Sequence, residues 1–383
     1  SPICIGLVGD VRAFFNEYSD GSGGDQSNRV APRDQQTQTA AVGPNDILEF
    51  QPVQIVDTTG PAGQMVAYQT LVPKDWKTTG GIQWSNADGA QGCFTGARLI
   101  WGAASQDEQY GVAFLDPMSW SVNALGTPGP GCLQLDLTDA EAVMQAYFQI
   151  ISSVVQVDIQ KVERPEELRP IYESYNATWQ TTLPNSNAWT DAVAITARAT
   201  SETSQNDAQI IAVTHHLELY QNQQLQARSG RTGIIIALTT PVGALDQGHP
   251  AFGVIMNNLQ TNPQWQQARA QWWAAKKQGI RNDAAARRAA ASASATSSSS
   301  VGDMMFESWK RREASSDASH QSAVNSIMEV QPYQTTSGQT VMLNQNYNHA
   351  WELSNGAVVM TNNANFNPMQ TYGQTGQEMR NAN

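Results

Sequence analysis

Charged side chains are scarce in this chain. Asp, Glu, Lys and Arg make up 15% of its 383 residues, against about a quarter in typical globular domains. Acidic residues outnumber basic ones by 34 to 22, which gives a formal net charge of −12. A protein with this charge is not attracted as a whole to nucleic acid or to anionic lipid. We therefore expect no nucleic-acid partner.

Long apolar runs and cysteines are also few. No stretch reaches the roughly 18 consecutive apolar residues of a transmembrane helix, so no transmembrane segment is expected. The three cysteines allow one disulfide and leave one thiol over. Cys93 and Cys132, each preceded by glycine, are the expected pair in an oxidising compartment. Cys4 has no basic neighbour in the sequence that would lower its pKa and make it reactive.

The motifs of common catalytic and cofactor sites are missing as well. The sequence has no G-x-S-x-G elbow, no phosphate-binding G-x-x-x-x-G-K-[ST] loop and no H-E-x-x-H or paired C-x-x-C zinc motif. The glycine-rich stretch 126–131 contains two prolines, which is typical of a rigid turn. We therefore expect no catalytic, cofactor-binding or metal-binding residues, and the chain is interpreted as a non-enzyme, although an enzyme is not excluded.

The apolar residues, 40% of the chain, are enough to build a core. Short apolar runs between turn residues predict antiparallel strands, and capping signals at Thr138–Glu141 and Asn262-Pro263 predict two helix starts. Asn355-Gly356 between apolar runs predicts a β-hairpin. The predicted class is α+β, with one or two antiparallel-sheet α/β sandwich modules, a helical hairpin and a C-terminal β-hairpin. The expected division is an N-terminal arm (1–45), a first module (46–165), a second sheet-rich module (166–262), the helical hairpin with an Ala/Ser-rich connection (263–330), the C-terminal β-hairpin (331–368) and a polar tail (369–383), mobile or partner-bound.

One segment combines basic and aromatic residues. Between Arg269 and Arg312 lie nine basic and three acidic residues. One interpretation is an interaction helix for an acidic partner, a glycan or an anionic surface. The other is a helix whose Trp face packs on the sheet while its basic face is solvated. The candidate interaction surface comprises Trp272, Trp273, Lys276, Lys277, Arg281, Trp309 and Arg311.

Two further groups of residues carry side chains suited to metal binding or acid-base chemistry. His215 and His216 are adjacent in a predicted strand, so they should point to opposite faces, one into the core and one to the surface, and they cannot easily share one metal ion. An enzyme with a dispersed site would use one of them with an acid such as Glu218. Asp136, Asp139 and Glu141 offer carboxylates for calcium, but they lack an EF-hand loop and fit the charge pattern of a helix start better.

Two stretches carry a family resemblance. The first is Val72-Pro73-Lys74-Asp75-Trp76 with Gly80-Gly81-Ile82-Gln83-Trp84, and the second runs from Tyr347 through Trp351 and Asn355-Gly356 to Asn365-Phe366-Asn367-Pro368. They resemble a group of exported bacterial proteins with a PkGW…GG…W segment and a C-terminal W…NG…T…NFNP hairpin. Asp75 and Val358 depart from that pattern, where Gly and an aromatic residue are usual. The segment around Trp76 is also similar to the PsbP-like α/β sandwich.

The resemblance and the missing motifs together give the functional expectation. It is a non-enzymatic, exported structural or binding protein, in the periplasm, at the cell surface or secreted, and part of an envelope or extracellular assembly. Its partner is expected to be another protein or a further copy of itself. The alternatives are a hydrolase-like enzyme with a dispersed site, or a module that binds carbohydrate or peptide through tryptophan.

Overall fold

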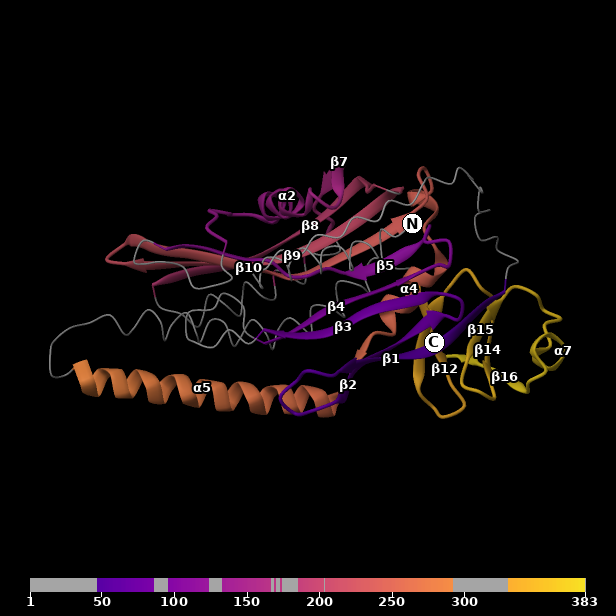
Figure 1. Ribbon diagram of the computed structural model, residues 1–383. Helices are drawn as coiled ribbons and strands as arrows, with labels where there is room; N and C mark the ends of the chain where they lie inside the picture. Colours follow the sequence, from indigo (N-terminus) through magenta and orange to yellow (C-terminus); the bar gives the residue numbers. More distant parts are fainter. Residues whose placement is uncertain are drawn as a thin grey trace, which may run out of the picture.

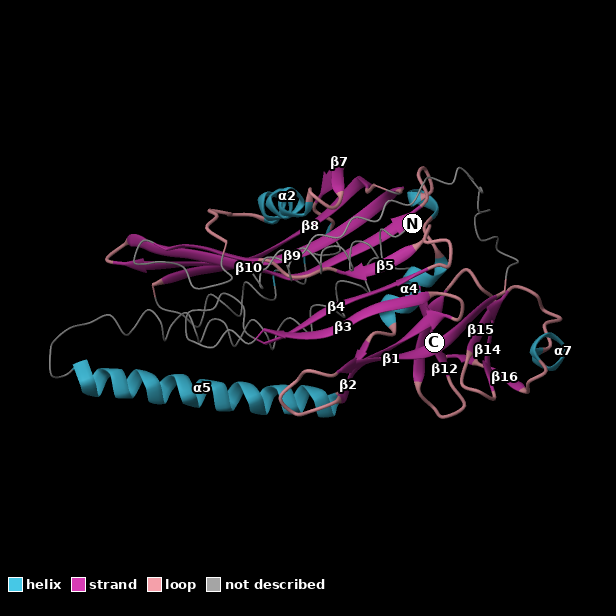
Figure 2. Cartoon of the chain, viewed as in Figure 1, coloured by secondary structure: helices cyan, strands magenta, loops and turns pink. Residues whose placement is uncertain are grey.

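The protein is built mostly from antiparallel β-sheet with few helices (Figures 1 and 2). The α+β class predicted from the sequence is therefore correct in its antiparallel sheets and gives too much weight to helices. The computed structural model describes residues 47–85, 96–123, 133–166, 169, 173, 185–202, 204–291 and 330–382.

The strands form three sheets, which we name A, B and C. Sheet A has the order β11-β2-β1-β15-β14-β16, sheet B the order β3-β4-β5-β10-β9-β8-β7 with β6 beside β10, and sheet C the order β13-β12-β17. The strands of sheet A are β1 (Leu48–Asp57), β2 (Met65–Pro73), β11 (Gln260–Thr261), β14 (His349–Leu353), β15 (Val358–Thr361) and β16 (Gly376–Glu378). Those of sheet B are β3 (Lys77–Ser85), β4 (Gly96–Ala104), β5 (Gly111–Phe114), β6 (Ser119–Asn123), β7 (Gln156–Glu163), β8 (Ser186–Thr200), β9 (Gln205–Gln221) and β10 (Gln224–Thr240). Sheet C contains β12 (Val330–Gln334), β13 (Thr340–Asn344) and β17 (Arg380–Asn381).

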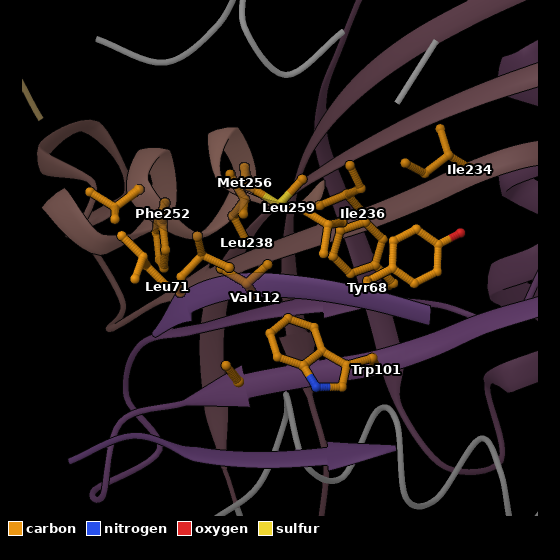
Figure 3. Packing of buried hydrophobic residues seen from close by; sticks show 14 of the residues in the cluster. Tyr68, Leu71, Trp101, Val112, Ile234, Ile236, Leu238, Phe252, Met256 and Leu259 are labelled. Atoms are coloured by element: carbon orange, nitrogen blue, oxygen red, sulfur yellow. The ribbon is translucent and has the colours of Figure 1, made fainter. Parts of the chain in front are cut away.

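Sheet B has a hydrophobic core on each face. Successive residues of β9 show why: Ile211 and Val213 belong to the core shared with sheet A, whereas Ile210 and Ala212 belong to the core under helix α2. The shared core also contains Trp101, Val112 and Phe252, which lie together in Figure 3. A strand buried on both faces has an almost continuous apolar sequence, as in the run 233–238.

Few helices accompany the sheets. Helix α2 (Ala140–Ile151) lies over sheet B, α4 (Pro250–Asn257) is buried in the shared core, and α5 (Pro263–Ala291) runs along the opposite side of the molecule (Figure 1). A short 3₁₀ turn η2 (Leu245–Gln247) precedes α4, and α7 (Pro368–Tyr372) lies near the C-terminus. The α2 start differs from the predicted capping box, because Asp139 rather than Thr138 is the N-cap and its side chain accepts from the Ala142 N–H. The predicted Asn262 cap of α5 is present: its side-chain oxygen accepts from the Gln264 N–H at 2.9 Å.

The predicted C-terminal hairpin is present as β14–β15. Gly356 has φ +80°, whereas Asn355 keeps a negative φ and its side chain accepts from the Ala357 N–H. The sequence beyond Pro368, predicted as a polar tail that is mobile or partner-bound, contains two short strands. Its strands β16 and β17 pair with β14 and β12, and Met379 between them is buried in the shared core.

Strands from both predicted modules join in one sheet. β10, which falls in the predicted second module, pairs with β5 and β6 of the predicted first module as well as with its neighbour β9. Of the predicted helical hairpin, the structure describes α5 through Ala291, and the second helix lies outside the described residues. The predicted N-terminal arm and all three cysteines, including the expected Cys93–Cys132 pair, also lie outside them.

Candidate functional site

A buried carboxylate fixes the start of α5 to the sheets. The Asp57 side chain at the end of β1 is almost fully buried, and its Oδ2 accepts from the indole N–H of Trp265 at 2.8 Å and of Trp84 at 2.7 Å. Its Oδ1 accepts from the backbone N–H groups of Thr59 and Gly60 at 3.1 and 2.8 Å. Four donors around one carboxylate offset the cost of its burial. Asp57 therefore joins β1, β3 and α5.

The aromatic residues of the predicted interaction surface continue this docking along α5. Trp272 meets Trp84 edge to face with ring centroids 4.9 Å apart, and Trp273 meets Trp272 at 4.8 Å. Trp273 is 7% exposed and Trp272 partly buried. The guanidinium of Arg269 lies over the Trp265 ring at 4.9 Å. In the described structure these tryptophans pack α5 against the protein.

The basic residues of the same surface follow this anchor along α5. Lys276 is partly exposed, and the residues around and after it whose side chains are described are exposed: Ala274, Ala275, Gln278, Gly279 and Asn282. Lys277 and Arg281 belong to α5, but their side chains are outside the described set. Trp309 and Arg311 lie outside the described residues altogether. Among the side chains that the structure describes, those of the first turns anchor the helix, and those from Ala274 to Asn282 are exposed or partly exposed.

The two adjacent histidines occupy opposite faces of β9, as predicted. The His215 Nδ1 and the Thr190 hydroxyl are 2.9 Å apart, and the His216 Nε2 and the Thr214 hydroxyl are also 2.9 Å apart. The expectation that one of the two reaches the surface is wrong, since each is 2% exposed. Sequence alternation assigned the faces correctly but could not show that both faces are covered here.

His216 belongs to an aromatic row that crosses four strands. Cross-strand pairing aligns Trp189 of β8, His216 of β9, Gly230 of β10 and Trp120 of β6. The Trp189 ring stacks on His216 with centroids 4.9 Å apart and planes 4° apart, and Trp120 meets His216 at 5.4 Å. Gly230 makes room for Trp120, since a Cβ at this position would lie 2.2 Å from the indole. The row is a rigid, tightly packed unit.

A polar row lies next to it on the same face, aligning Asn187, Glu218 and Arg228. The Glu218 carboxylate accepts from the Tyr220 hydroxyl at 2.8 Å, from Asn187 at 3.2 Å and from two guanidinium nitrogens of Arg228 at 2.9 and 2.7 Å. Burial raises the pKa of Glu218, but the hydrogen bonds from Tyr220, Arg228 and Asn187 outweigh it and hold the pKa below its ordinary value. Glu218, the acid that a dispersed active site would use, is thus hydrogen-bonded by three side chains.

The carboxylates considered for calcium serve separate purposes. Asp136 pairs with Arg228, and Asp139 caps α2. Within the described residues, no three His, Cys, Asp or Glu side chains come together as a group that could hold a metal ion. Of the described helices, none has the length and apolar character needed to cross a membrane.

His249 has a structural setting that the sequence did not indicate. It is the N-cap of α4, where its Nδ1 accepts from the Ala251 N–H at 3.1 Å. Its ring packs among Trp76, Tyr110 and Phe252, with centroid distances of 5.2, 4.7 and 5.8 Å. Burial lowers the pKa of His249 to about 4 although nearby Asp107 opposes this. The imidazole is therefore neutral at pH 7.

Comparison with known proteins gives no relative for this arrangement: no protein-family model, no curated protein and no solved structure matches the chain.

Proposed function

We propose that this protein is a non-enzymatic structural or binding component of an exported bacterial assembly, located in the periplasm, at the cell surface or outside the cell. Its α+β sandwich character and its exported address are part of this proposal, which the two sequence stretches around Trp76 and Trp351 support. Helix α5 is the element through which it contacts an acidic protein surface.

The observation that carries the proposal is the contrast between the two parts of α5. Trp265 and Trp273 are buried and Asp57 holds the helix start, so the direction of the helix is fixed. After Trp273, the side chains that the structure describes are exposed or partly exposed. A fixed helix loses little conformational entropy when a partner binds it, which favours affinity.

Charge supports an acidic partner. The sequence of α5 contains six basic residues, Arg269, Lys276, Lys277, Arg281, Arg287 and Arg288, and one acidic residue, Asp283. The helix therefore carries +5 and the rest of the chain −17, which together give the net charge of −12. Opposite charges on two surfaces speed up their encounter and restrict the choice of partner. The acidic remainder of a second copy is one such surface.

A charge-reversal experiment tests this function. Complexes of the protein would be sized by light scattering after mild extraction from the native host and after purification. The triple variant Lys276→Glu, Lys277→Glu, Arg281→Glu should lose the high-mass species while its thermal unfolding stays unchanged. The matched control is a triple variant at exposed positions in the anchored first turns of α5: Gln266→Glu, Gln267→Glu, Gln271→Glu. This control should retain the high-mass species. Wild-type protein that is monomeric in both preparations would contradict the proposal.

A further inference from the structure

The face of sheet B that carries Trp189 continues past α2 as a partly exposed surface. We name this surface the Trp189 face; it comprises Val122, Asn187, Trp189, Glu218, Tyr220 and Arg228, with Asp136 beside it. Asn187 and Val122 are exposed, Trp189 and Tyr220 partly exposed. Val122 is 39% exposed, so an apolar group adjoins the polar ones in solvent. None of these residues belongs to α5 or to the Asp57 anchor.

The Trp189 ring is held in one orientation before any ligand arrives. One side of the ring stacks on His216, and Trp120 supports His216 from the opposite direction. The strand β7 pairs with β8 only from Ala194 to Thr200, so among the described strands none lies beyond Trp189 on the outer side. A fixed, partly exposed aromatic ring offers a flat apolar platform at little entropic cost.

The polar side chains beside the platform are also fixed, and most are planar. The Glu218 carboxylate is held by Arg228, Tyr220 and Asn187, and Arg228 is held in addition by Asp136. The Asn187 amide and the Tyr220 hydroxyl, both held by Glu218, can donate to and accept from neighbouring hydroxyls of one ligand. Such a set of donors and acceptors suits a ligand that has both an apolar face and a row of hydroxyl groups.

Charge excludes an anionic ligand. The Trp189 face contains two carboxylates, Glu218 and Asp136, and one cation, Arg228, which both carboxylates already engage. Phosphate, sulfate or a uronic acid would meet a net charge of −1 and an arginine whose donors are largely occupied. A neutral polyhydroxyl ligand avoids this repulsion.

We propose that the Trp189 face is a binding site for a neutral saccharide. One sugar ring stacks its C–H face on the exposed side of Trp189, and its hydroxyls bond the Asn187 amide and the Tyr220 hydroxyl. An oligosaccharide, longer than a single sugar, can contact the Trp189 ring and the neighbouring polar row at the same time. This site shares no residue with α5. The saccharide proposal can therefore be tested separately from the proposed contact of α5 with an acidic protein.

Isothermal titration calorimetry of the purified full chain tests the proposal. The probes are neutral oligosaccharides of four to six units, namely cello-, xylo-, malto- and chito-oligosaccharides. At least one should bind, and Trp189→Ala should weaken binding about tenfold or more, because the variant loses both the stacked ring and the apolar area that the sugar buries on it. Asn187→Ala, an exposed position, should weaken binding several-fold, and Trp189→Phe should retain part of the affinity.

Trp272→Ala is the control, since this tryptophan is also partly buried but lies on α5. It should leave saccharide affinity unchanged. The melting temperature of each variant, followed by circular dichroism, separates loss of binding from loss of fold. Absence of binding by wild type to every probe would overturn the proposal, as would binding that Trp189→Ala leaves intact or that Trp272→Ala weakens equally.

Discussion

At the scale of single residues, the buried carboxylates of the described part of the chain are held by specific donors. Asp57 is surrounded by two indole and two backbone N–H groups. Asp116 is bonded by Arg98, and burial raises its pKa to about 6 against the opposing effect of that arginine. Each such arrangement depends on close packing, so small changes in volume beside it should be costly.

Gly60 leaves no room for a side chain beside the Asp57 carboxylate. A Cβ there would lie 2.4 Å from the Asp57 Oδ2 and 2.9 Å from the Trp84 Nε1, so the carboxylate would have to move away from its donors. Gly60→Ala should lower the free energy of unfolding by roughly 2 to 3 kcal/mol. Gly81→Ala is the control, since its Cβ would have only the Val56 carbonyl oxygen near it, at 3.7 Å, and should change stability by less than about 1 kcal/mol. Equal effects of the two changes in urea unfolding would refute this account of Asp57.

His249 gives a prediction for pH. Its pKa in the folded protein is about 4, below the ordinary value of about 6.5, so the unfolded chain binds more protons between these values. Stability from this residue is complete above about pH 6.5 and is lost as pH falls towards 4, by roughly 3 kcal/mol. His249→Asn keeps an N-cap acceptor but does not titrate. The difference in unfolding free energy between wild type and variant should therefore change across pH 4 to 6.5, and a constant difference would contradict the prediction.

At the scale of elements, the side-chain amide of Asn258 makes the two hydrogen bonds to β13 that a neighbouring strand would otherwise make. The amide of Asn258, at the end of α4, donates to the Met342 carbonyl at 2.6 Å and accepts from the Met342 N–H at 2.9 Å. This pair of bonds attaches β13, and with it sheet C, to the buried helix α4. Asn258 also donates to the Val254 carbonyl at 2.8 Å, which fixes the amide orientation.

Removing this amide should loosen sheet C before the rest of the molecule. Asn258→Ala leaves the Met342 backbone groups without these bonds and should cost about 2 to 3 kcal/mol. Hydrogen exchange at the Met342 amide should accelerate more than exchange in β9. Gln339→Ala, at the exposed turn between β12 and β13, should leave both rates unchanged. Uniform acceleration in both sheets would show that α4 and sheet C unfold together with sheet B.

At the scale of the whole molecule, neighbours in the sheets come from distant parts of the chain. β1 pairs with β15, and β10 pairs with β5 and β6. The sequence division at 165/166 therefore separates strands that share one sheet. Contacts between such distant segments are formed against a large loop-closure entropy, which favours cooperative folding of the connected sheets.

A fragment of residues 46–165 should accordingly fail to fold by itself. It lacks β10, the partner of β5 and β6, and β8, the partner of β7. Its near-ultraviolet circular dichroism should lack the tryptophan signals of the full chain, and limited proteolysis should degrade it rapidly. A fragment that unfolds cooperatively on heating would instead support the division into two modules.

The sequence by itself determined the local features of this protein. Alternation assigned His215 and His216 to opposite faces, Asn262-Pro263 marked the start of α5, and Asn355-Gly356 marked a hairpin, because these signals depend on backbone preferences of adjacent residues. Only the tertiary structure decided that both histidines are buried, that Asp57 meets Trp265 across 208 positions, and that Trp189 joins Asn187 and Arg228 on one surface. Those relations follow from strand register and packing between remote segments, which no short stretch of sequence encodes.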